Sequence, residues 1–462
     1  MRKLLKKSFV LFLALCTIFA LAACGMAKKN EAARDDSTSP MSPSEDYSIA
    51  GAYDAMISKE AYGVDGGAVA EAAPSAGEPG GYPSDGDEEK PVEPKSAGLI
   101  TASAWNENDN YEFWLGLFIE GQSAEENGKF LDFYKNHNWG FDSTKRVKVS
   151  VKEGDEAVRG AAVACYDENG KLTFAARTDA NGVAYLFPQT TTGKIFVKSG
   201  ENSANAEFDR DNREIEVVLD GSEAVENLIQ IMLVVDITGS MGDELSYLQA
   251  ELADVVERIV ATNPNTKIEL ALLFYGDDVD KDLKLTYHDF INVNDAEGIQ
   301  VQVDNILSQK LAWGGDPPEA VDEALELAME KSWNDSAATK IIFHLLDAPH
   351  HSNDYDPQRR YEERYTAAVE KAASMGVRIC PVICSGADKV CEYVVRQASI
   401  YTGGTTIFVT SHSGIGGDHL DPEIPDLVVE KLNDLMVRLV NGYHTGVFAE
   451  PVRWYPNNQT QQ

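Results

Sequence analysis

Residues 231–242 read IMLVVDITGSMG and combine the pattern of a buried strand with side chains that could bind a cation. Four apolar residues, Met232–Val235, end in an acid, Asp236, and the hydroxyls of Thr238 and Ser240 follow at alternating positions. Burying a lone carboxylate is costly, so an acid at the end of an apolar strand needs a partner. A carboxylate with two hydroxyls is an all-oxygen donor set, which hard cations prefer. These residues therefore predict a Mg²⁺ site, with Mn²⁺ or Ca²⁺ as alternative ions.

The sequence around this loop alternates apolar strands with amphipathic helices. Such alternation is typical of a parallel sheet covered by helices on both faces, and ligands of such sheets lie beyond the carboxyl ends of the strands. We therefore expect an α/β fold with a doubly wound, mostly parallel sheet over residues 223–445. We expect strands at 228–236, 267–277, 339–347, 377–386 and 405–410, and helices at 243–263, 294–310, 317–332, 359–376, 387–404 and 424–442.

Three stretches resemble the von Willebrand factor A (VWA) family. They are VVDITGSM at 234–241, GGDPPEA at 314–320 and LLDAPHH at 345–351. The resemblance covers about half of the chain, residues 227–441, and includes the YTGG that precedes the last expected strand. It implies a VWA, Rossmann-like fold and a role in adhesion or assembly.

The resemblance also implies a metal-ion-dependent adhesion site. Its first loop would supply Asp236, Thr238 and Ser240, and its third loop would supply Asp347. The second loop of the family usually supplies a threonine, and the candidate here is Asp316. One coordination position of the metal stays open in such sites for a carboxylate, or another anionic oxygen, of a partner. A third carboxylate from Asp316 would make the metal a poorer acceptor for such a group.

Each of these residues also has a purely structural interpretation. Ser240 or Thr238 could cap the helix that follows the loop. Asp316, with Glu319 three residues later and two prolines between them, looks like a capping box at the start of a helix. The pair His350–His351 would contribute extra ligands or, in the structural interpretation, would be exposed loop residues.

The first residues predict an exported lipoprotein. Residues 1–23 place four basic residues before an apolar run, which is the layout of a secretory signal. The run ends in Leu21–Gly25, which resembles a bacterial lipobox in which Cys24 is acylated. Residues 24–100 are rich in small and acidic residues and predict a disordered tether. We expect the protein to be extracytoplasmic and to contact the cell membrane, or an outer membrane, only through its lipid.

A further β-rich unit is expected between the tether and the α/β domain. Residues 101–222 start with an aromatic-rich segment, with one short helix near 124–136, and continue as short strands separated by turns. The stretch at 160–188, GAAVACYDENGKLTFAARTDANGVAYLFP, resembles small β-sandwich repeats and carboxypeptidase regulatory-like domains. We expect a small all-β sandwich here, and a C-terminal tail at 446–462.

The net charge of the chain restricts the partners that it can bind. The formal net charge of −35 argues against nucleic acid as a partner, because such recognition needs a basic patch. The leading hypothesis is a binding module rather than an enzyme, with a protein or another anionic ligand as partner. Two alternatives are a metal-dependent hydrolase that uses Asp236, Asp316 and Asp347, and a structural surface protein whose metal only stabilises the fold.

Overall fold

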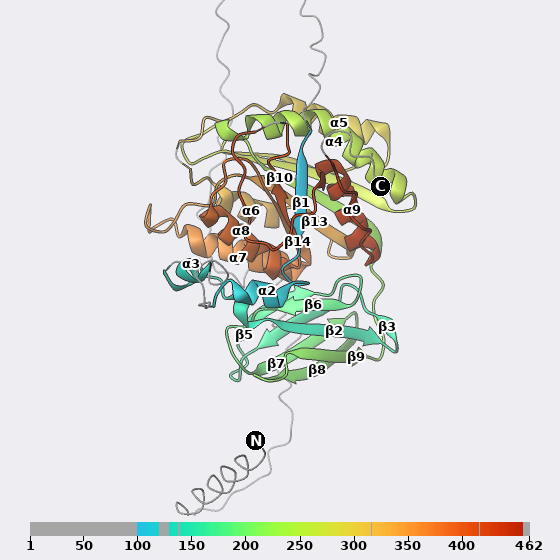
Figure 1. The fold of residues 1–462 in the computed structure, drawn as a ribbon. Helices are drawn as coiled ribbons and strands as arrows, with labels where there is room; N and C mark the ends of the chain where they lie inside the picture. The colour runs from blue at the N-terminus through green and yellow to red at the C-terminus, as the bar shows by residue number, and fades with distance from the viewer. Residues whose placement is uncertain (1–98, 120–128, 137–138, 316, 415, 456–462) are drawn as a thin grey trace, which may run out of the picture. The chain divides into compact units, whose positions relative to one another are not determined.

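The computed structural model describes most of the chain after the expected tether. It covers residues 99–119, 129–136, 139–315, 317–414 and 416–455 (Figure 1). The expected signal peptide, Cys24, all but the last two residues of the expected tether, and Asp316 lie outside these ranges. Within the described ranges, no helix is both long and apolar enough to cross a membrane.

A mixed eight-stranded sheet carries the loop that contains Asp236, Thr238 and Ser240 (Figure 1). The five central strands, β11, β10, β13, β14 and β15, pair in parallel, whereas β12, β1 and β16 pair with their neighbours in the antiparallel sense. In order across the sheet, the strands are β12 (Leu285–Asn292), β11 (Lys267–Tyr275), β10 (Glu226–Asp236), β13 (Ala337–Leu346), β14 (Val377–Ile383), β15 (Thr406–Val409), β1 (Thr101–Trp105) and β16 (Glu430–Lys431).

The expected fold class, a doubly wound and mostly parallel sheet, is therefore wrong. Antiparallel strands lie at both edges of the large sheet, and antiparallel pairing also dominates two smaller sheets. β1 comes from residues 101–222, where the sequence predicts a separate β-rich unit, and it pairs with β15 through Ala102–Val409 and Trp105–Thr406. A short apolar run does not reveal which strand it will pair with, or in which direction, because those contacts are far away in sequence.

Helices cover the central strands of this sheet. Every residue of β10 after its first two is buried, as expected for a strand with covered faces rather than one that alternates between core and water. The two faces of β10 belong to two different apolar clusters. Ile231 and Leu233 lie in the first cluster, and Met232 and Val234 lie in the second. The first cluster includes α4 (Gly242–Thr262), α5 (Ala296–Ser308) and α9 (Leu432–Thr445), and the second includes α6 (Val321–Met329), α7 (Tyr361–Met375) and α8 (Lys389–Thr402).

Two expected helices are shorter than the sequence pattern suggested. α6 begins at Val321 rather than at residue 317, and its N-cap residue is Ala320. α9 begins at Leu432 rather than at residue 424, because Glu430 pairs with Ala102 of β1 and its carboxylate binds Arg438. Bends, irregular backbone and the two-residue strand β16 thus replace the first turns of the expected last helix.

Two four-stranded sheets form the β-rich part. Alternation along β2, where every second residue is buried, explains why this segment forms a half-buried strand. Buried valines of β2 share an apolar cluster with Val163 and Cys165 of β4, so the two sheets pack on each other. One sheet contains β2 (Val147–Glu153), β3 (Glu156–Ala157), β6 (Val183–Leu186) and β9 (Glu214–Leu219), and the other contains β4 (Ala162–Tyr166), β5 (Leu172–Arg177), β7 (Gly193–Ser199) and β8 (Asn202–Phe208).

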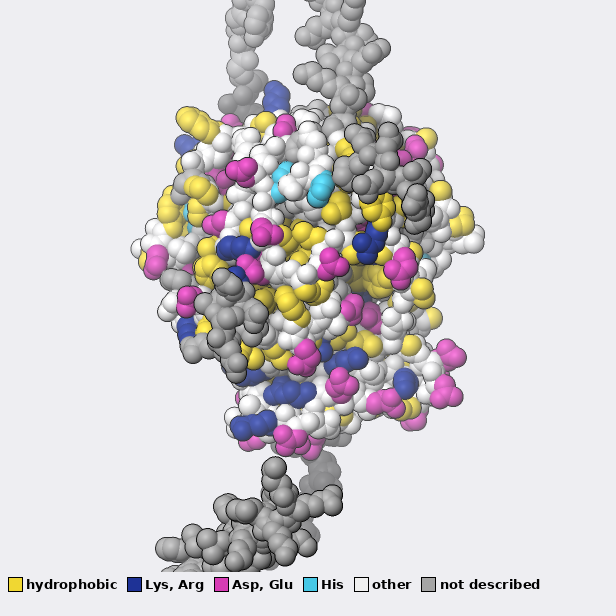
Figure 2. Space-filling model, in the orientation of Figure 1, with side chains coloured by type: hydrophobic (Ala, Val, Ile, Leu, Met, Phe, Trp, Pro, Cys, Tyr) yellow, Lys and Arg dark blue, Asp and Glu magenta, His cyan; other side chains and the backbone are white. Residues whose placement is uncertain are grey.

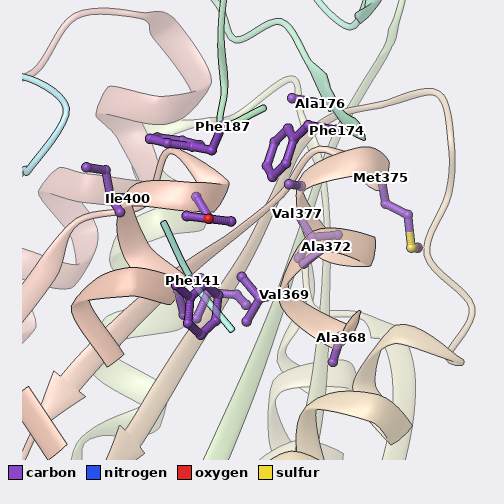
Figure 3. Close-up of a cluster of buried hydrophobic side chains, with 14 of the residues drawn as sticks. Phe141, Phe174, Ala176, Phe187, Ala368, Val369, Ala372, Met375, Val377 and Ile400 are labelled. Carbon is purple, nitrogen blue, oxygen red and sulfur yellow. The ribbon is translucent and has the colours of Figure 1, made fainter. Parts of the chain in front are cut away.

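A single apolar core joins these sheets to helices of the large sheet. Figure 3 shows Phe174 of β5 and Phe187 facing side chains of α7 and α8, among them Val369 and Ile400. The ring of Phe187 stacks on Tyr401, with 4.6 Å between the ring centroids. The β-rich part therefore shares its hydrophobic core with the larger sheet.

Short helices complete the aromatic-rich segment. They are α2 (Tyr111–Gly116), α3 (Leu131–Asn136) and the 3₁₀ helix η1 (Ser143–Lys145). α3 covers the second half of the short helix expected at 124–136, and residues 120–128 lie outside the described ranges. On the face that Figure 2 shows, Lys and Arg side chains are interspersed with Asp and Glu.

Candidate functional site

Asp236 is the last residue of β10 and is fully buried. Its Oδ1 accepts hydrogen bonds from the backbone N–H of Thr238, at 2.8 Å, and from the Thr238 hydroxyl, at 2.7 Å. Its Oδ2 is buried and has no hydrogen-bond partner. Burial, followed by the charge of Asp347, raises the pKa of Asp236 to about 7. One oxygen of this carboxylate is thus held in place, and the other has no hydrogen-bond donor.

The two hydroxyls follow on a short 3₁₀ helix, η2 (Gly239–Met241), that leads into α4. The hydroxyl oxygens of Thr238 and Ser240 lie 3.4 Å apart, and Ser240 is exposed. Neither side chain caps a helix, because the cap positions of η2 and α4 have no side-chain hydrogen bond. The capping interpretation of these hydroxyls is therefore wrong.

Asp347 reaches the same place from the neighbouring strand. It directly follows β13, which is parallel to β10, so the carboxyl ends of both strands meet at one edge. Burial raises the pKa of Asp347, while a hydrogen bond with Ser240 opposes that shift. The structure therefore brings Asp236, Thr238, Ser240 and Asp347 together.

The second loop also approaches the site, although Asp316 itself lies outside the described residues. Gly314 has a positive φ of 66°, and a Cβ at this position would lie 3.2 Å from the Cβ of Thr238. A larger residue would have to adopt an unfavourable backbone and push against the first loop. The helix that Asp316 was expected to cap has Ala320 as its N-cap, so the capping-box interpretation is wrong.

Sequence reasoning missed Glu319 as a member of this cluster. Its side chain is 5% exposed, and its Oε2 is buried without a hydrogen-bond partner. Burial and the nearby charges of Asp236, Asp277 and Asp347 raise the pKa of Glu319 to about 10. The capping-box interpretation places Glu319 in a helix that starts at residue 317, four residues before the actual start of α6.

A buried acid–histidine pair lies beside the cluster. Asp277 Oδ1 and His351 Nε2 are 2.8 Å apart, and both side chains are at most 1% exposed. His350 is also buried, so the interpretation of His350–His351 as exposed loop residues is wrong. Asp277 carried a sequence signal, because it follows an apolar strand that is parallel to β10 and ends at the same edge.

The donor set is mixed rather than purely acidic. In the part of the chain that the structure describes, no group of three or more His, Cys, Asp or Glu side chains could hold a metal ion. The four residues of the expected site instead offer two carboxylates and two hydroxyls, which are the oxygen donors that Mg²⁺ prefers. A cation at this site would compensate the negative charge on the unpartnered Oδ2 of Asp236. The residues present therefore fit a hard divalent cation.

Comparisons with known proteins give little further information. No family model and no curated protein matches the chain. The chain is similar to the pilus adhesin SpaC from Lactobacillus rhamnosus GG in its open conformation, with 10% sequence identity and a TM-score of 0.31 over 46% of this chain and 29% of that chain. A second crystal form of SpaC gives 13% identity and a TM-score of 0.30 over 46% of this chain and 30% of that chain. The match thus spans less than a third of the adhesin, at TM-scores too low to establish a shared fold.

Proposed function

We propose that this chain is a surface-bound binding protein that holds a divalent cation at Asp236, Thr238, Ser240 and Asp347. The cation would be Mg²⁺, Mn²⁺ or Ca²⁺, as in the adhesion sites of the VWA family, whose motifs the sequence resembles. The partner is a protein, or another molecule, that offers an anionic oxygen. An acyl chain on Cys24 would tether the protein to the membrane.

The unpartnered oxygen of Asp236 carries this proposal. A fully buried carboxylate with one unsatisfied oxygen costs stability unless a cation or a donor compensates it. The acids around it, among them Asp347 and Asp277, carry charges that make its ionisation harder. A purely structural acid at this position would be expected to have an Arg or Lys partner.

Each residue of the site has a separate role. Thr238 fixes one oxygen of Asp236 with two hydrogen bonds, so that the other oxygen keeps a set direction. The hydroxyl of Ser240 hydrogen-bonds with Asp347 and links the two loops. When bound, the cation would supply positive charge and an open coordination position for the partner's oxygen. Glu319 is a further acid close enough to Asp236 for their charges to interact.

Titration calorimetry of the full chain with Mg²⁺, after treatment with EDTA, tests the metal part of this proposal. We expect one binding site, a rise in melting temperature with metal as ligand linkage requires, and loss of both responses in Asp236→Ala. Asp254→Ala is the matched control, because it removes an acid on α4 whose side chain is half exposed and faces Arg258. Absence of heat in wild-type protein at millimolar metal, with Mn²⁺ and Ca²⁺ also silent, would overturn the proposal.

A further inference from the structure

Trp313 is the most exposed large hydrophobic side chain in the described part of the protein, at 87%. An indole has a large apolar surface and is among the residues that dominate binding energy at interfaces. Its neighbours in sequence alternate, because Leu311 and Gly315 are exposed whereas Ala312 and Gly314 are buried. The segment therefore lies with one side on the protein and presents Leu311 and Trp313 on the other.

The backbone on both sides of Trp313 is anchored. The N–H of Ala312 donates to the carbonyl oxygen of Ile237 at 2.8 Å, directly beside the first loop of the candidate site. The N–H groups of Trp313 and Gly314 donate to the two oxygens of Asp280, each at 3.0 Å. An exposed indole on an anchored segment loses little conformational freedom when a partner binds, and such preorganisation favours affinity.

Trp313 lies next to the candidate site. Its carbonyl oxygen would be 3.5 Å from a Cβ placed on Gly239, and a Cβ on Gly314 would be 3.2 Å from the Cβ of Thr238. A molecule that places an anionic oxygen on a cation bound by Asp236 would therefore lie close to this segment. Exposed apolar side chains that gather in one place mark an interaction surface, whereas a single one does not.

Two aliphatic side chains extend this surface. Val279 is 57% exposed, and its methyl groups would lie within 4 Å of a Cβ on Gly315. Leu311 is 44% exposed and lies against Gly242 at the start of α4. Aliphatic neighbours give no hydrogen bonds to sugar hydroxyls, so this surface suits an apolar side chain better than a glycan.

We propose that Trp313, Leu311 and Val279 bind an apolar side chain of a partner polypeptide, next to an Asp or Glu whose carboxylate faces the cation site. This inference rests on the proposed function, because the site is rich in acids and would repel a carboxylate without a cation. The partner is thus a protein segment that carries an acidic residue directly beside an aromatic or aliphatic one.

A peptide array tests this recognition directly. The probes are capped peptides in which one Asp is flanked by each residue type in turn, with matching Asn peptides as the acid control. We expect Mg²⁺-dependent binding of the full-length protein, strongest where an aromatic or aliphatic residue adjoins Asp. Trp313→Ala should weaken that binding by about tenfold or more, as for a central aromatic contact. Trp313→Phe should restore part of it.

Two measurements separate this inference from the metal site. Trp313→Ala should keep wild-type Mg²⁺ affinity in calorimetry, whereas Asp236→Ala should lose both Mg²⁺ and peptide binding. Val447→Ala is the matched control, since Val447 is 74% exposed and follows α9, and it should change neither. Binding by Trp313→Ala at the wild-type level, no preference for apolar flanks, or binding to a glycan array instead of peptides would each overturn the inference. If wild-type protein does not bind Mg²⁺, that result would count against the proposed function itself.

Discussion

At the scale of single residues, buried charges without full compensation mark both ends of the central strands. Asp236 lies at the carboxyl end of β10, and Lys340 lies near the start of β13 with 3% of its surface exposed. The ammonium of Lys340 donates to the backbone oxygens of Asn334 and Asp335, at 3.2 and 3.3 Å. Two main-chain oxygens compensate a buried cation only in part. Lys340 therefore costs the protein stability whenever it is charged.

Burial, with the nearby charge of Arg177, lowers the pKa of Lys340 to about 7. Since an unfolded lysine titrates near pH 10.4, the unfolded state binds more protons between pH 7 and 10, and stability should rise with pH across this window. We expect Lys340→Met to raise the free energy of unfolding by about 2 kcal/mol at pH 7 and to flatten this rise. Urea denaturation over this pH range measures both effects. The control is Lys171→Met, at an exposed position, and its stability should rise with pH as steeply as that of the wild-type protein.

At the scale of elements, a buried ion-pair network ties the segment after β1 to α8. Arg396 is fully buried and binds Glu107 at 2.8 Å and Glu392 at 2.9 Å. The Thr406 hydroxyl donates to Glu107 at 3.0 Å, which adds a link to β15. Burial raises the pKa of Glu107 despite the attraction of Arg396, so the network depends on complete pairing. These contacts fix where β1 enters the large sheet.

Removing one partner of this network should be severe. Glu107→Ala leaves Arg396 with one carboxylate in a buried site, and we expect a loss of about 3 kcal/mol in the free energy of unfolding by chemical denaturation. The double variant Glu107→Met with Arg396→Met should recover part of this loss, because apolar groups replace a buried ion pair at little cost and Glu392 keeps Lys389 as a partner at 3.0 Å. Glu216→Ala, which breaks an exposed pair with Lys152, should leave stability nearly unchanged. A loss in Glu107→Ala no larger than in Glu216→Ala would show that the network is not needed.

At the scale of the whole molecule, the sequence predicts what local patterns encode. Apolar periodicity predicts most of the strands and helices, because each pattern lies within one element. The proximity of Asp236 and Asp347 is also predictable, since parallel neighbours end at the same edge of a sheet. The place of β1, the pairing of Glu107 with Arg396 and the burial of Glu319 are not, because each depends on contacts distant in the chain.

The shared core leads to a prediction about how the protein unfolds. Phe174 and Phe187 of the β-rich part pack on α7 and α8 (Figure 3), and β1 lies between β15 and β16 in the large sheet. A fragment of residues 223–462 would lack these partners, so it would expose the apolar faces of both helices and leave β15 an open edge. We expect this fragment to aggregate or to lack a cooperative thermal transition. A fragment of residues 99–462 should unfold in one calorimetric transition at the temperature of the full chain. Cooperative unfolding of the 223–462 fragment at that same temperature would show that the large sheet folds independently, and that the shared core contributes nothing to its stability.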